Sequence, residues 1–230
     1  MMGDFRNAVL LVRILWIGQH EWRTFKSIYV DRQTRLSYPY RMQLSLCLDE
    51  YVVFDLETTG LSPWAGDEII EIGAMKVFGD QVDEVNYFHS LVNPKRLISP
   101  EASRINGITN EMVADAPVFD EVFPKFLDFV GSAYLVAQNA KFDMSFLMKH
   151  MVQKKISRPF EVYDTVQFSR RVFPDEQRHN LDLICKRLEL QVEEGDRHRS
   201  IGDVKLTARA FVLLRDRLGD NLPPREKWTI

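Results

Sequence analysis

The stretch that decides the fold spans residues 54–60 and reads Phe-Asp-Leu-Glu-Thr-Thr-Gly. It continues a short apolar, β-branched run that begins at Tyr51, and this pattern predicts a buried strand over residues 51–56. Side chains alternate along a strand, so Asp55 and Glu57 point to the same face at its end. Two carboxylates at this spacing resist burial unless a cation such as Mg²⁺ or Mn²⁺ neutralises them. A solvated strand end with two unrelated acids is the alternative interpretation.

Two later segments add acids of the same kind. Asp143 follows an apolar stretch over residues 134–137 and stands at the start of a helix predicted over residues 141–154. An acid at a helix start is common because the helix dipole favours it. His198 precedes Asp203 by five residues where the last predicted helix, residues 201–218, begins. Surface roles are reasonable for each residue separately, but the set in this order indicates a site.

The surrounding pattern predicts a mixed α/β sheet. Residues 68–78 and 82–92 read as strands, and the Gly79-Asp80 pair between them is a turn signal for a hairpin. Apolar residues recur at helical spacing over residues 117–130, where Pro124 predicts a kink or a break. A further helix is expected over residues 181–190. Strands followed by strand–helix alternation favour a sheet with helices packed against it.

Three segments together resemble a known family: residues 54–60 (FDLETTG), 139–143 (NAKFD) and 198–203 (HRSIGD). They are similar to the three motifs of the DEDDh (DnaQ-like) 3′→5′ exonucleases. That family includes the proofreading ε subunit of bacterial DNA polymerase III and the exonuclease domain of Gram-positive replicative polymerases. The resemblance extends over residues 49–218. It implies an RNase H-like fold, a five-stranded mixed sheet flanked by helices, and release of nucleoside monophosphates from DNA 3′ ends in proofreading or repair.

The resemblance also implies roles for the acids and the histidine in a reaction that uses two Mg²⁺ or Mn²⁺ ions. Asp55 would bridge the two ions. Glu57 and Asp203 would complete the site on the nucleophile side, and Asp143 would hold the second ion. His198 would act as general base on the attacking water, since histidine titrates near neutrality.

Contacts with the terminal nucleotide are implied for the turn after the first motif and for two further segments. These residues are Thr58, Thr59, Gly60, Leu61, Ile105, Asn106, Asn139 and Phe142. For Leu61 and Phe142, ordinary core packing is an alternative of nearly equal weight. Many relatives have histidine where this chain has Asn106 and Gln138, and alanine where it has Ser200. These departures concern nucleotide affinity and preference, not the reaction class.

Charge divides the 230-residue chain into unequal parts. The net charge is −3, from 30 basic and 33 acidic residues, but residues 1–48 hold seven basic and three acidic ones. We therefore expect an N-terminal extension over residues 1–48, an exonuclease domain over residues 49–219 and a short C-terminal tail over residues 220–230. We expect the extension to be helical. It could pack on the domain, dock a polymerase or hold a nucleic-acid backbone, and its aromatic residues favour packing.

Composition restricts the remaining classes of protein. The chain is 45% hydrophobic and 27% charged, which is typical of a globular protein and excludes disordered and fibrous classes. Cys47 and Cys185 lie too far apart in sequence to build a zinc framework. The apolar run over residues 8–18 is too short for a membrane span and carries Arg13. We therefore expect a cytoplasmic protein without a membrane partner.

The expected partner is a single-stranded or frayed DNA 3′ end, with RNA as an alternative and a DNA polymerase subunit as a further candidate. Only a short segment follows the last predicted helix, which favours a stand-alone or differently recruited exonuclease over ε itself. An RNA-trimming exoribonuclease of the same superfamily is a second hypothesis. A non-catalytic nucleic-acid-binding module with the same fold is a third, and the five intact catalytic positions count against it.

Overall fold

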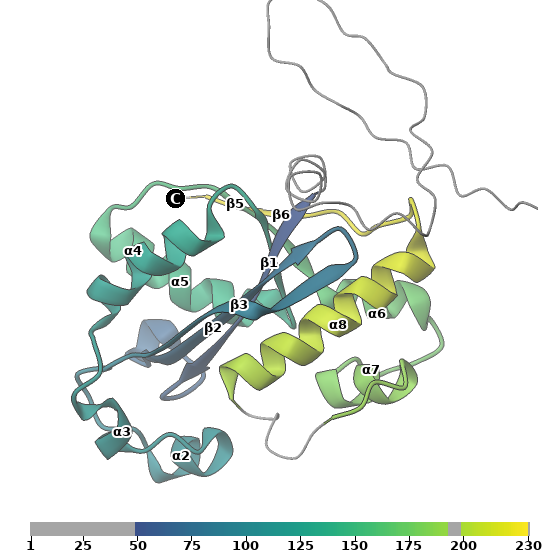
Figure 1. Ribbon diagram of the computed structural model, residues 1–230. Helices are drawn as coiled ribbons and strands as arrows, with labels where there is room; N and C mark the ends of the chain where they lie inside the picture. Colours follow the sequence, from purple (N-terminus) through teal and green to yellow (C-terminus); the bar gives the residue numbers. More distant parts are fainter. Residues whose placement is uncertain (1–48, 193–198, 230) are drawn as a thin grey trace, which may run out of the picture. The chain divides into compact units, whose positions relative to one another are not determined.

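The computed structural model describes residues 49–192 and 199–229, which form a six-stranded mixed sheet flanked by helices (Figure 1). The strand order is β3-β2-β1-β4-β5-β6. β1 pairs parallel with β4 and β4 with β5, whereas the other neighbours are antiparallel. The strands are β1 (Glu50–Thr58), β2 (Ile69–Phe78), β3 (Gln81–Leu91), β4 (Tyr134–Ala137), β5 (Phe160–Asp164) and β6 (Glu226–Trp228). The mixed sheet with flanking helices is confirmed, with one strand more than expected.

The extra strand, β6, lies in the segment expected to be a short tail. Its three residues pair with β5, with Trp228 opposite Phe160 and Glu226 opposite Val162. A strand of three residues carries too little alternation to be recognised from sequence. The extension over residues 1–48, expected to be helical, lies outside the described residues.

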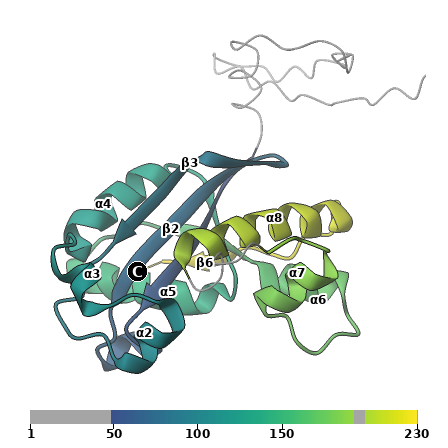
Figure 2. The same ribbon diagram turned by 60° about the horizontal axis from the view of Figure 1, so that its bottom comes forward.

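Helices cover both faces of the sheet. They are α2 (Pro100–Asn106), α3 (Asn110–Ala114), α4 (Phe119–Val130), α5 (Ala140–Lys154), α6 (Thr165–Val172), α7 (Leu181–Arg187) and α8 (Ser200–Leu218), with a 3-10 turn η1 at Pro63–Ala65. α4 and α5 lie on one face, and α8 lies on the other with α6 and α7 (Figures 1 and 2).

Strand β1 contributes side chains to both hydrophobic layers. Val52, Phe54 and Leu56 pack in the layer under α4 and α5. Tyr51 and Val53 pack in the opposite layer, under α8. Because side chains alternate along a strand, Asp55 and Glu57 continue the series that faces α8. The alternation in β1 therefore decides which helix the two acids meet.

A kink or a break was expected at Pro124, and helix α4 is not broken there. A proline in a helix interior costs roughly 3 kcal/mol, because it removes a hydrogen bond and clashes with the preceding turn. The helix buries Val122, Phe123, Phe126 and Val130, each almost completely. Burying one such side chain is worth about 1.5–3 kcal/mol, so the four together outweigh the cost of the proline.

Among the described helices, the longest is α8, and none combines the length and the apolar character that a membrane crossing requires.

Candidate active site

Three acids meet where β1 ends beneath the first turn of α8. Asp55 and Glu57 from β1 and Asp203 from α8 each present a carboxylate oxygen, and these atoms lie within 4.8 Å of one another. Three negative charges at this spacing repel one another strongly in a partly buried position. Oxygen donors in such a group suit a hard divalent cation, which would remove the repulsion. The donor set therefore fits the metal dependence expected for the family.

A glycine on β2 brings α8 close enough to complete this group. Gly73 lies opposite Asp55 in the β1–β2 register. A Cβ atom at Gly73 would lie 2.6 Å from Ser200 Oγ and 2.8 Å from the Ser200 carbonyl carbon. The start of α8 therefore rests directly on the backbone of β2. With a side chain at Gly73, Ser200 would have to shift, and Asp203, three residues further on, would move with it.

Glu71 holds the start of α8 from the same strand. Its carboxylate is 1% exposed and accepts hydrogen bonds from Arg199 Nη2 at 2.6 Å and from the Ser200 amide at 2.8 Å. His89 Nε2 lies 2.8 Å from the same carboxylate. Burial alone raises the pKa of Glu71, but the hydrogen bonds from His89, Arg199 and Ser200 outweigh burial and lower that pKa to about 2. Glu71 thus fixes both residues that open α8.

Sequence reasoning missed Glu71, although a signal was present. It is a charged residue within the apolar first half of β2, and glutamate is almost never fully buried unless it is paired.

Replacing Glu71 with glutamine should lower the free energy of unfolding at pH 7 by about 3 kcal/mol, because each unit by which folding lowers the carboxyl pKa corresponds to about 1.4 kcal/mol of stability. The carboxyl pKa is lower in the folded protein (about 2) than its ordinary value of 4.5. Its stabilising effect is therefore complete above pH 4.5 and is lost as the pH falls toward 2. Urea unfolding of both proteins between pH 7 and pH 3 should show the difference shrinking in acid.

A matched control for this measurement is Glu50→Gln on the neighbouring strand. Glu50 pairs with Lys76 at 2.6 Å, but its side chain is 32% exposed. Exposed pairs contribute at most about 1 kcal/mol, so this variant should remain close to wild type. Equal losses in the two variants would contradict the anchoring role of Glu71.

Asp143 lies next to the three-acid group but is held differently. β4 ends at Ala137 and the chain turns into α5, so the amide of Leu56 is left without a partner from β4. Asp143 Oδ1 accepts a hydrogen bond from that amide at 3.1 Å. The side chain is 2% exposed, and burial together with the negative charges of Glu57 and Asp164 raises the pKa of Asp143 well above its usual range. A nearby cation would reverse this effect by favouring the ionised carboxylate.

The general base assigned from sequence, His198, lies outside the described residues. The described chain resumes at Arg199, one residue later and four residues before Asp203.

Four of the residues expected to contact a nucleotide form an exposed pair and a buried pair. Leu61 is 81% exposed and Ile105 is 56% exposed, so core packing does not account for Leu61. Thr59 and Asn106 are buried and bonded internally. The Thr59 hydroxyl donates to Asp67 Oδ1 and accepts from the Glu68 amide, and Asn106 Oδ1 accepts from the Ile108 amide. The exposed pair is available to a ligand, whereas the buried pair shapes the loops.

The other residues expected to contact a nucleotide differ from one another in their burial and their contacts. Thr58 is buried and donates to the Gly60 carbonyl at 2.6 Å. Phe142 packs against Phe146 at the edge of the core, with ring centroids 5.2 Å apart. Asn139 opens α5 in a left-handed conformation with φ of 60°. Its side chain makes no capping bond there.

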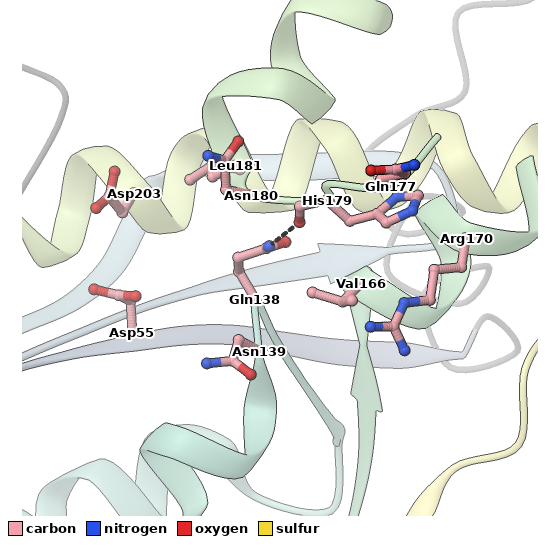
Figure 3. Close-up of a pocket in the computed structure, with 10 residues that line it drawn as sticks. All are labelled: Asp55, Gln138, Asn139, Val166, Arg170, Gln177, His179, Asn180, Leu181 and Asp203. Atoms are coloured by element: carbon pink, nitrogen blue, oxygen red, sulfur yellow. Dashed lines mark hydrogen bonds between the residues drawn. The ribbon is translucent and has the colours of Figure 1, made fainter. Parts of the chain in front are cut away.

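Gln138, which replaces a histidine common in the resembled family, is held by neighbouring residues. Its Nε2 donates to the His179 carbonyl at 2.8 Å (Figure 3). Its Oε1 accepts from the Thr165 hydroxyl. Gln138 lines a cavity that Asp55 and Asp203 also line, but it is not one of the acids that could hold a metal ion.

Comparison with known proteins identifies the family. A family model described as an exonuclease matches residues 52–211. The chain is 35% identical over 175 residues to the DNA polymerase III subunit epsilon of Buchnera aphidicola, with 72% of this chain and 71% of that protein aligned. It is 40% identical over 169 residues to the PolC-type DNA polymerase III of Caldanaerobacter subterraneus subsp. tengcongensis. The match covers 74% of this chain but only 12% of that polymerase.

A solved structure agrees with these matches. Exonuclease X in complex with 5′ overhanging duplex DNA superposes with a TM-score of 0.61 and 31% identity, over 74% of this chain and 93% of that one. The residues matched by the family model include all four acids, from Asp55 on β1 to Asp203 on α8. The chain therefore belongs to the exonuclease family, and residues 52–211 form an exonuclease domain of the DEDDh (DnaQ-like) type.

Proposed function

We propose that the chain hydrolyses phosphodiester bonds at DNA 3′ ends in the 3′→5′ direction and releases nucleoside monophosphates. The observation that supports this best is the meeting of Asp55, Glu57 and Asp203 within 4.8 Å, with Asp143 beside them. Two bound Mg²⁺ or Mn²⁺ ions would supply an activated water and neutralise charge on the leaving oxygen. Similarity to a PolC-type DNA polymerase III and to an epsilon subunit of DNA polymerase III supports DNA as the substrate and a cytoplasmic location.

Each acid would have its own part in holding the ions. Asp55 would contribute to both positions, as the resemblance to the family implies. Glu57 and Asp203 would complete one position and Asp143 the other. His198 would accept the proton of the attacking water as general base.

The terminal nucleotide would lie against the turn that follows β1. Leu61 and Ile105 are exposed and apolar, so they can contact a base face without reading its identity. Thr58, Thr59, Gly60 and Asn106 would shape this wall, and Asn139 and Phe142 would border it from α5. Contacts of this kind are sequence-tolerant, as degradation of any DNA end requires.

Digestion of single-stranded DNA labelled at its 5′ end tests both direction and metal dependence. With Mg²⁺ or Mn²⁺ the label should pass into a ladder of progressively shorter strands, because nucleotides leave from the 3′ end. EDTA should stop the reaction, since the acids alone repel the phosphate.

Immediate release of a labelled mononucleotide would contradict the proposed direction, and digestion that persists in EDTA would contradict the role of the metals. An RNA strand of the same sequence tests the alternative substrate. Faster shortening of the RNA would assign the enzyme to RNA trimming. A polymerase partner is a separate proposal, tested by co-purification with replicative polymerase subunits.

A further inference from the structure

A cavity of about 430 Å³ leads away from the acidic group toward α6 (Figure 3). Asp55 and Asp203 lie at one end of the labelled residues and Arg170 at the other. The volume falls within the range typical of ligand sites. Of the residues assigned to the terminal nucleotide, Asn139 lines this cavity, whereas Leu61 and Ile105 do not. The cavity therefore starts at the acids and Asn139 and extends toward α6 without reaching Leu61 or Ile105.

Helical spacing explains why Arg170 faces this cavity. Val166 and Arg170 are four residues apart on α6, which places them on the same face of the helix, and both line the cavity. The next residue, Arg171, lies about 100° further round the helix. Its Nη1 donates to the Asn221 and Leu222 carbonyls at 2.9 and 3.1 Å, on the C-terminal segment. Two adjacent arginines thus serve different surfaces.

Hydrogen bonds connect helix α6, which carries Arg170, to Asn139 at the start of the segment 139–143. Asp164 Oδ1 accepts hydrogen bonds from the Asn139 amide at 3.0 Å and from the Val166 amide at 2.9 Å. Asp164 is 8% exposed, so these bonds are shielded from water. The Asp164 carboxylate therefore holds the first turn of α6 and the start of α5 together, and these hydrogen bonds fix the position of Arg170 relative to Asp143.

Three polar side chains that line this cavity are available to a ligand. Within the described part of the chain, the side chains of Arg170, Gln177 and Asn139 make no hydrogen bond or ion pair with another residue. All three offer N–H donors, and Arg170 adds a positive charge with no carboxylate to neutralise it. A guanidinium matches a phosphate in shape and charge. The chemistry of the wall therefore suits an anionic, phosphate-bearing ligand.

We propose that Arg170, with Gln177, forms a subsite for the phosphodiester backbone of the strand that remains after cleavage. This inference rests on the proposed function. In the proposed function the scissile phosphate lies at the acids, held there by the metal ions that they would bind, and Leu61 and Ile105 contact the nucleotide to be released. The cavity beyond the acids then receives the nucleotides upstream of the scissile bond, and Arg170 meets one of their phosphates.

The test compares Arg170→Gln with wild type on two substrates. One is a single-stranded oligodeoxynucleotide, and the other is the p-nitrophenyl ester of thymidine 5′-monophosphate, which has no upstream nucleotide. We expect KM for the oligonucleotide to rise about tenfold, as for loss of one charge-assisted hydrogen bond. Hydrolysis of the small ester should be unchanged. The slope of log KM against log salt concentration should fall by about 0.7, as for loss of one phosphate contact on a single strand.

Arg171→Gln is the matched control, with the same change of charge on the same helix, and it should leave KM and its salt slope as in wild type. Equal changes for both substrates in Arg170→Gln would overturn the subsite, and so would an oligonucleotide KM equal to that of Arg171→Gln. Wild-type protein that cleaves neither substrate would instead overturn the proposed function. The two failures are therefore distinguishable.

Discussion

Replacing Asp55 with asparagine should lower the rate of DNA hydrolysis by at least about a thousandfold. Metal ions at a phosphoryl centre stabilise the transition state by several kcal/mol, and each 1.4 kcal/mol is a factor of ten in rate. Asp55 is the acid that contributes to both metal positions in the proposed site, so its loss affects both. Single-turnover release of mononucleotides at saturating Mg²⁺ measures the effect on the chemical step.

Metal-induced thermal stabilisation provides an independent readout. A ligand that binds only the folded state raises its stability with concentration. Mg²⁺ or Mn²⁺ should therefore raise the melting temperature of the wild-type protein, and Asp55→Asn should lose most of this shift. Without metal the variant should be at least as stable as wild type, because one of three mutually repelling charges has been removed.

Glu50→Gln is a suitable control because it removes a carboxylate from the opposite end of the same strand. It should keep both the activity and the metal-induced shift. If Asp55→Asn retained wild-type activity, the acidic group would not be the catalytic centre. If it lost activity but kept the full metal shift, the ions would bind elsewhere.

The second large effect is expected for His198→Ala, with at least a hundredfold loss in kcat. A general base contributes about 10²–10⁴-fold to such reactions. KM should change little, because a proton acceptor acts in the transition state and not in ground-state binding. The metal-induced thermal shift should also be retained, in contrast with Asp55→Asn. This pattern of kcat, KM and metal binding distinguishes a missing base from a missing ligand.

Added imidazole tests the role of His198 directly. If the side chain accepts a proton, imidazole in solution should restore part of the rate of His198→Ala in proportion to its concentration. The same imidazole should not restore Asp55→Asn, where the missing group is a metal ligand. Unchanged activity of His198→Ala at neutral pH would remove His198 from the proposed mechanism.

Local patterns in the sequence were enough to predict the strand β1 and the helix α8, which carry Asp55, Glu57 and Asp203. The alternation of β1 predicted that Asp55 and Glu57 share a face, and the periodicity of residues 201–218 predicted α8 within one residue of its start. Such patterns are readable because a strand repeats every two residues and a helix every 3.6, and both elements are long enough to show several repeats.

Elements that depend on distant partners were not predictable in the same way. β6 is a strand only because Trp228 and Glu226 pair with β5, more than 60 residues earlier in the sequence. Helix α4 survives Pro124 because the sheet and α5 bury its apolar side chains. In both cases the free energy comes from tertiary contacts, which override local propensity.

By itself, the sequence determined the fold class, the family and the set of acids, because these depend on residue types at short spacings along the chain. Only the tertiary structure decided how the acids are supported. Glu71 lies 128 residues before Arg199, and Gly73 and Ser200, which lie against each other, are similarly far apart in the sequence. The difference between Arg170 and Arg171 likewise depends on which surface each side of α6 meets. Contacts between residues so far apart leave no local periodicity, since they exist only after the chain has folded.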